Sequence, residues 1–202
     1  MFDLNIGKTA VEYARSVIDS IVKFKETPDM NLSNFFKDKY GAFVTINTYP
    51  DQNLRGCIGI PMPVMSLKEA ITEGARSATH DPRFPPLAEY ELDDIIVEVT
   101  ILGIPELIEI YNPEEYLEKI KIGRDGLIVE QGFFKGLLLP QVPVEYKWDL
   151  LTYLSHTCTK AGLPPEAWKD KKTKIYKFTG QVFYEQEPRG EIKEKKLDGT
   201  KY

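Results

Sequence analysis

The chain has 202 residues, of which 42% are hydrophobic and 28% charged, a composition typical of a globular protein. Its 26 basic and 31 acidic side chains give a net charge of −5, which argues against bulk electrostatic binding of nucleic acid. The N-terminal residues lack a basic segment followed by an apolar run, and no window approaches 18 consecutive apolar residues, so we expect neither a signal peptide nor a membrane helix.

The first half of the chain predicts two helices and a hairpin. Apolar residues at helical spacing predict an amphipathic helix over residues 7–24. Residues 42–46 (AFVTI) read as a strand, and LRGCIGI (54–60) reads as its hairpin partner across a turn-forming segment. Ser66 and Glu69 form a capping box that begins the next helix. This helix must end near Asp81, because the residue before a proline avoids the helical region.

The second half mixes strands and helices without a regular βαβ rhythm. Residues 91–103 predict a long strand, and a capping box from Asn112 to Glu115 begins a short helix. Further strands are predicted at 125–132, 135–140 and 174–185, and helical segments at 148–161 and 163–168. This order favours an α+β fold with a mainly antiparallel sheet and flanking helices. We predict a single domain over residues 1–186 and a loosely held charged tail over 187–202.

The segment LRGCIG carries the first of only two cysteines. Alternation along a strand places Arg55, Cys57 and Gly59 on one face, with Gly56 on the other face. The Arg55 guanidinium near the thiol would favour the thiolate and make the cysteine reactive. We expect Gly59 to leave open space beside the sulfur and Gly56 to allow close packing behind it. The alternative is that Cys57 is a small buried hydrophobe and the glycines mark a bulge.

The second cysteine, Cys158, lies on the apolar stripe of its predicted helix, so we expect it in the core. Two cysteines cannot build a disulfide framework, and a reducing cytoplasm fits this chain best.

The segment THDPRFPPL (79–87) offers polar side chains on a stretch stiffened by three prolines. A carboxylate and a histidine near a thiol would suit acid–base chemistry, which makes His80, Asp81 and Arg83 candidates beside Cys57. The alternative is that Phe84 pins the loop to the core while the polar groups bond nearby backbone.

Glu98 lies inside an otherwise apolar strand, so its carboxylate needs a partner, and Arg55 or Arg83 would serve. The two histidines are far apart and no H-E-x-x-H or cysteine cluster is present, which argues against a zinc site. The sequence has no P-loop, no G-x-G-x-x-G and no G-x-S-x-G, so it names no cofactor. Residues 168–178 interleave basic and aromatic side chains, and we interpret them as a solvated basic edge rather than a nucleic-acid site.

LRGCIG followed by DPRFPPL (81–87) resembles the AMMECR domain family. Further matches follow in the family's order, in residues 125–132, 136–142, Trp148 and 160–168. The resemblance implies an α+β fold with a larger and a smaller lobe and with LRGCIG lining a cleft between them. It implies no settled activity, and it associates bacterial and archaeal members with Memo-like proteins and radical S-adenosylmethionine proteins. It draws attention to the positions Arg55, Gly56, Cys57, Gly59, Asp81 and Arg83.

Two functions therefore stay open. The first is a small-molecule enzyme or ligand-binding protein, with Cys57 as a nucleophile or redox group, Arg55 and Arg83 holding an anionic ligand, and Asp81, His80 or Glu98 managing protons. The second is a non-catalytic binding module or adaptor that works with a Memo-like or radical-SAM partner protein. The residues alone identify neither the substrate nor the oligomeric state.

Overall fold

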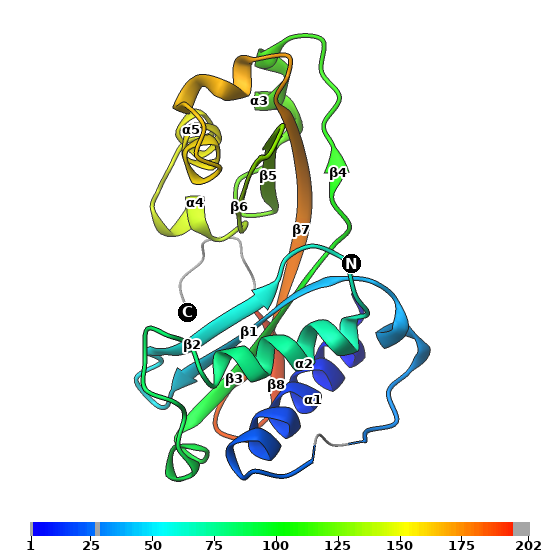
Figure 1. Cartoon of the computed structure of the whole chain (residues 1–202), viewed down its shortest axis with the longest axis vertical. Helices are drawn as coiled ribbons and strands as arrows, with labels where there is room; N and C mark the ends of the chain where they lie inside the picture. The colour runs from blue at the N-terminus through cyan, green and yellow to red at the C-terminus, as the bar shows by residue number, and fades with distance from the viewer. Residues whose placement is uncertain (1, 27–28, 196–202) are drawn as a thin grey trace. The chain divides into compact units, whose positions relative to one another are not determined.

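The computed structural model describes residues 2–26 and 29–195, which form two compact units (Figure 1). Unit 1 contains the described residues up to Leu102 together with Gln181–Lys195, and unit 2 contains Gly103–Gly180. Strand β7 (Lys174–Glu185) begins in unit 2 and ends in unit 1, so the chain leaves unit 1 after Leu102 and returns through β7.

Unit 1 is an antiparallel sheet with two helices on one face (Figure 1). Its strands are β1 (Gly41–Thr48), β2 (Leu54–Ile60), β3 (Ile95–Leu102), the end of β7 and β8 (Ile192–Lys195). The order is β2-β1-β3-β7, and β8 pairs with β7, which leaves β2 at an edge. Its helices are α1 (Leu4–Val22) and α2 (Leu67–Ala78), with short 3-10 turns η1 (Asn34–Lys37) and η2 (Glu89–Glu91).

Period-two alternation builds the core of unit 1. Val44 and Ile46 of β1 and Val97 and Val99 of β3 are fully buried against the helices, as the alternation of the predicted strand indicates. The Ser66–Glu69 capping box is present at the start of α2, and α2 ends just before the Asp81-Pro82 segment. These predictions are confirmed.

Unit 2 is a smaller antiparallel sheet with its own apolar core. Its strands are β4 (Glu106–Leu107), β5 (Asp125–Gln131), β6 (Phe134–Leu138) and the first part of β7, in the order β6-β5-β7-β4. Its helices are α3 (Tyr116–Lys119), α4 (Val142–Glu145) and α5 (Leu150–Lys160), with turns η3 (Pro113–Glu115) and η4 (Pro165–Lys169). Cys158 is buried with Leu154 and Trp168, as its place on the apolar stripe of α5 predicts.

The predicted α+β fold, with antiparallel sheets and flanking helices, is therefore confirmed. The predicted tail is not loosely held throughout, because Ile192–Lys195 form β8, which pairs with β7. Residues 196–202 of that tail lie outside the described residues. None of the helices in the described ranges has the length and apolar character needed to cross a bilayer.

Candidate functional site

Strand β2 carries the LRGCIG segment and is pressed closely against α2. A Cβ placed on Gly56 would lie 2.3 Å from the carbonyl oxygen of Ala78, so only glycine permits this approach. The predicted close packing behind Cys57 is confirmed. The space predicted at Gly59 is absent, because a Cβ there would lie 2.6 Å from both the Cα and the ring of Phe43.

A row of polar side chains crosses the face of the unit 1 sheet opposite to the helices. Thr45 of β1 is directly paired with Cys57 of β2 on one side and with Glu98 of β3 on the other. The Thr45 hydroxyl donates to the Cys57 sulfur at 3.2 Å, and the Lys195 ammonium of β8 lies 3.3 Å from Glu98. The row therefore places a thiol, a hydroxyl, a carboxylate and an ammonium in sequence. We call these residues, Cys57, Thr45, Glu98 and Lys195, the Cys57 row.

Glu98 is partnered differently from the prediction. Its side chain is 14% exposed and pairs with Lys195, not with Arg55 or Arg83. The expectation that a carboxylate in this strand needs a cation holds, but the cation comes from a strand that the sequence pattern did not reveal.

The thiol of Cys57 is held in its neutral form. Burial raises the pKa of Cys57 above its ordinary value, and the nearby Glu98 and Asp81 carboxylates raise it further. The Thr45 hydrogen bond and the Arg83 charge lower the pKa but do not outweigh burial. The predicted thiolate, activated by Arg55, is not what this geometry favours.

Asp81 is hydrogen-bonded to the backbone at the outer edge of β2. Its side chain is 1% exposed and accepts hydrogen bonds from the backbone N–H of Cys57 at 2.9 Å and from the backbone N–H of Arg83 at 3.1 Å. The Arg83 guanidinium donates to both Asp81 oxygens, at 3.0 and 2.6 Å, and to the Cys57 carbonyl at 3.3 Å. These side chains satisfy the outward backbone groups of Cys57, which a further strand would otherwise pair.

The same contacts decide what Asp81 can do chemically. The Arg83 hydrogen bonds hold the pKa of Asp81 far below its usual range, so the carboxylate stays charged near neutral pH. Because both oxygens are already engaged, Asp81 is a positioning residue rather than a proton carrier.

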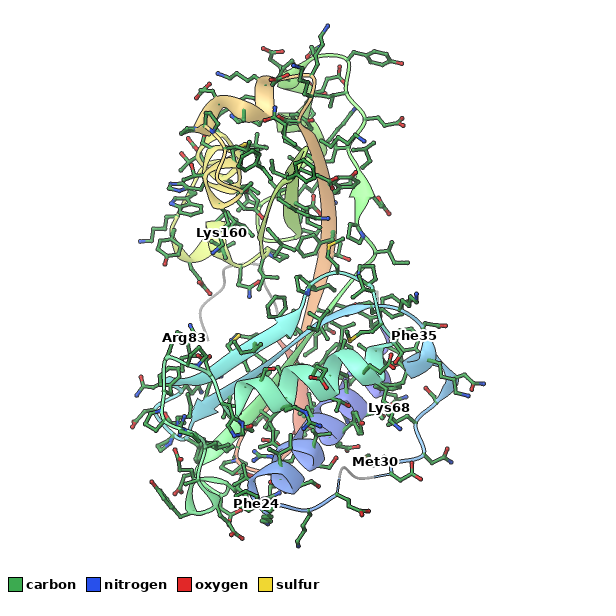
Figure 2. All side chains as sticks on the ribbon, in the orientation of Figure 1. Phe24, Met30, Phe35, Lys68, Arg83 and Lys160 are labelled. Atoms are coloured by element: carbon green, nitrogen blue, oxygen red, sulfur yellow. The ribbon has the colours of Figure 1, made fainter. Side chains whose placement is uncertain are left out.

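The two arginines of the candidate site have different surroundings. Arg55 is 12% exposed and donates to both carboxylate oxygens of Glu91, at 2.7 and 3.0 Å. Arg83 is 54% exposed and lies beside β2 (Figure 2). The guanidinium groups of Arg55 and Arg83 lie 5.9 Å and 5.7 Å from the centroid of the Phe84 ring. Phe84 therefore contacts both arginines. Arg83 is thus the more accessible cation.

His80 lies apart from the Cys57 row. The Thr79 hydroxyl donates to the Arg76 carbonyl at 2.8 Å, so the Nδ1–H of His80 donates to that hydroxyl at 2.9 Å. The ring lines a hollow with Ile58 and Pro82, on the helix side of the sheet. The structure therefore brings together Cys57, Asp81, Arg83 and Glu98 but not His80.

Sequence reasoning missed three members of this arrangement: Thr45, Glu91 and Lys195. A count along the predicted hairpin places Thr45 opposite Arg55, and only the irregularity between Ile46 and Asn47 brings it opposite Cys57. No signal indicated Glu91 or Lys195, because both are brought in by tertiary packing. Within residues 2–26 and 29–195, no group of three or more His, Cys, Asp or Glu side chains is placed to hold a metal.

The fold and the site define an α+β protein in which an aspartate–arginine pair is hydrogen-bonded to the backbone of the LRGCIG edge strand. The chain belongs to the AMMECR1 family, whose sequence profile matches residues 11–183. Protein MJ0810 of Methanocaldococcus jannaschii is 57% identical over 198 residues, covering 98% of each chain. Protein PH0010 of Pyrococcus horikoshii is 51% identical over 197 residues, covering 95% of each.

A crystal structure of PH0010, described as an uncharacterized protein, matches this chain with a TM-score of 0.84 and 48% identity, covering 95% of this chain and 97% of that one. The resemblance predicted from LRGCIG and DPRFPPL is confirmed. Membership of the family indicates the fold but identifies no reaction.

Proposed function

We propose that the chain binds a small anionic molecule beside β2 of unit 1, with Arg83 as the residue that holds the anion. The observation that carries this proposal is that the Arg83 guanidinium is both held in a fixed orientation and exposed to solvent. Its Nε and Nη2 atoms are fixed on buried Asp81, yet the side chain is 54% exposed. A cation oriented in this way loses little conformational freedom when it binds a carboxylate or phosphate.

In this proposal Cys57 contacts the ligand as a neutral thiol and is not an activated nucleophile. The raised pKa of Cys57 supports this role, because a nucleophilic cysteine needs its thiolate. Of the predicted acid–base residues, Glu98 is in register with Cys57 across β1, so a reaction on this face would use Glu98 to move a proton. Both cysteines are unpaired, which suits the cytoplasmic location that we also propose.

Protection of Cys57 from a neutral alkylating agent tests the proposal. Iodoacetamide labelling, read by mass spectrometry at Cys57 and at buried Cys158, is measured with increasing phosphate, citrate or acetate. We expect at least one anion to protect Cys57 saturably and the Arg83→Gln variant to lose this protection.

The matched control is Arg124→Gln. Arg124 is 48% exposed and paired with buried Asp125, but it lies in unit 2. This variant should keep the protection. The proposal fails if no anion protects the wild type, or if Arg83→Gln and Arg124→Gln behave alike.

A second candidate function is an adaptor for a Memo-like or radical-SAM protein. Apolar exposure in unit 2 favours it, because Phe133, in the turn between β5 and β6, is fully exposed and Phe134 is 54% exposed. Titration calorimetry with a purified Memo-like protein should give saturable binding that Phe133→Ser weakens and Phe24→Ser, at an exposed position of unit 1, does not. Equal heats for both variants, or none in the wild type, would exclude this candidate.

A further inference from the structure

Lys68 of α2 separates two hollows in the surface of unit 1, on the helix side of the sheet. The larger encloses about 650 Å³ and is lined by residues of 29–37 and the start of α2, including Met30 and Ser66. The smaller encloses about 410 Å³ between α1 and α2, with Tyr13, Met65 and Thr72 in its lining. Lys68 and Met30 are both labelled in Figure 2. Neither hollow includes Cys57, which lies on the opposite face of the sheet.

The charge of Lys68 is not balanced by a neighbouring carboxylate. Among the described residues Lys68 forms no ion pair. The nearest acidic residues along α2, Glu69 and Glu73, also line the smaller hollow, but each has another partner. Glu69 accepts from the backbone N–H and the hydroxyl of Ser66, and Glu73 pairs with Arg76.

The surroundings of Lys68 combine an apolar wall with polar groups. Its ammonium lies 6.0 Å from the centroid of the Tyr13 ring, whose hydroxyl is hydrogen-bonded to Thr72 at 2.9 Å. Tyr13 and Met65 therefore give the smaller hollow an apolar lining whose rim carries a half-buried cation. On the other side of Lys68, the hydroxyls of Ser33 and Ser66 line the larger hollow.

We propose that this place binds a small organic carboxylate. Lys68 holds the carboxylate, and the apolar body of the ligand lies against Tyr13 and Met65. Two features support this class of ligand: the ammonium of the half-buried Lys68 forms no ion pair with the described residues, and the adjoining hollow can bury several methylene groups. The site is separate from the anion site proposed at Arg83.

Methionine methyl resonances test this proposal, since the chain contains four methionines and, of the three that the structure describes, only Met65 lines the smaller hollow. Protein labelled with [13C]methyl-methionine is titrated with hexanoate. We expect a saturable shift at Met65 that exceeds the shift at Met62, which lines neither hollow. Hexanol, with the same body and no charge, should bind about tenfold more weakly, because it lacks the charge-assisted hydrogen bond to Lys68.

Two variants complete the test. Lys68→Gln should weaken hexanoate binding by about tenfold, while Lys171→Gln in unit 2 should bind as the wild type does. The proposal is overturned if Met65 does not respond, if Met62 responds more strongly, or if hexanol and hexanoate bind equally. The comparison of the two ligands needs only the wild-type protein, so it holds even if Lys68→Gln fails to fold.

Discussion

Each unit of the molecule contains a buried aspartate clamped by a half-exposed arginine close by in sequence. In unit 1, Asp81 is 1% exposed and Arg83 54%; in unit 2, Asp125 is 2% exposed and Arg124 48%. The two pairs differ in the backbone N–H group from which the carboxylate accepts a hydrogen bond. Asp125 accepts from the backbone N–H of Lys121, four residues earlier, whereas Asp81 accepts from Cys57, which is 24 residues away on an edge strand.

The unit 2 pair is a structural motif, whereas the unit 1 pair belongs to a candidate site. A buried aspartate with a half-exposed arginine is enough to close a local turn, as in unit 2. The unit 1 pair does more, because Arg83 also reaches the Cys57 carbonyl and its charge acts on the thiol. Arg83 is therefore a candidate ligand-binding residue because of its neighbours, and not because of the ion pair alone.

The largest expected effect is on stability. Asp81→Ala should lower the free energy of unfolding of unit 1 by about 3 kcal/mol, because it removes a buried carboxylate that accepts four hydrogen bonds and leaves the Cys57 N–H unpaired. Denaturant unfolding measures the loss, and amide hydrogen exchange locates it. Exchange at Cys57 should accelerate in Asp81→Ala and stay unchanged in Asp125→Ala. Equal acceleration in both variants would contradict the difference drawn between the pairs.

The contribution of Asp81 should also depend on pH. Its folded-state pKa is depressed, so its stabilising effect is present above the unfolded pKa and is lost as pH falls through the folded value. We expect the wild-type advantage over Asp81→Asn to shrink by about 2 kcal/mol as the pH is lowered from neutral to strongly acidic conditions. Parallel denaturation series across this range measure it. A constant difference at all pH values would show that Asp81 acts through packing.

A smaller effect is expected on the thiol when Thr45 is changed. The Thr45 hydroxyl lowers the pKa of Cys57 more than any other neighbour does, so Thr45→Val should raise it. Alkylation of Cys57 by iodoacetamide at neutral pH should then slow by roughly fivefold, since less thiolate is present. A rate profile against pH gives the pKa directly. An unchanged profile would show that the contact with the sulfur is not a hydrogen bond.

The smallest effect concerns the arginines themselves. Arg83 also lowers the pKa of Cys57, although less than Thr45 does, so Arg83→Gln should slow alkylation by roughly twofold. Arg124→Gln should leave the rate unchanged. If both variants reduce the rate equally, the effect comes from net charge rather than from the position of Arg83.

Local chemistry explains which parts of this arrangement were predictable. The Ser66–Glu69 capping box, the close approach at Gly56 and the hairpin of β1 and β2 follow from neighbouring residues, and each is present. The partners of charged side chains were not predictable. Arg55 pairs with Glu91 rather than approaching the thiol, and Glu98 pairs with Lys195, because those distances depend on how separate segments pack.

Strand β8 and the edge position of β2 were likewise not predictable from the sequence. The four residues of β8 are mostly charged, so they carry no apolar alternation that distinguishes a strand from a tail. The place of β2 at a sheet edge depends on strand order, which no single segment encodes. For that reason the sequence singled out Asp81 for proton transfer and Arg83 for ligand binding, but it did not indicate that this pair binds the backbone of an edge strand.

Retention of small molecules from a cell extract tests the central claim most directly. Wild-type protein, Arg83→Gln and Arg124→Gln are each incubated with extract and separated by size, and the bound compounds are identified by mass spectrometry. We expect a carboxylate- or phosphate-bearing compound to be retained by the wild type and Arg124→Gln and lost from Arg83→Gln. Retention by all three proteins, or by none, would contradict an anion site at Arg83.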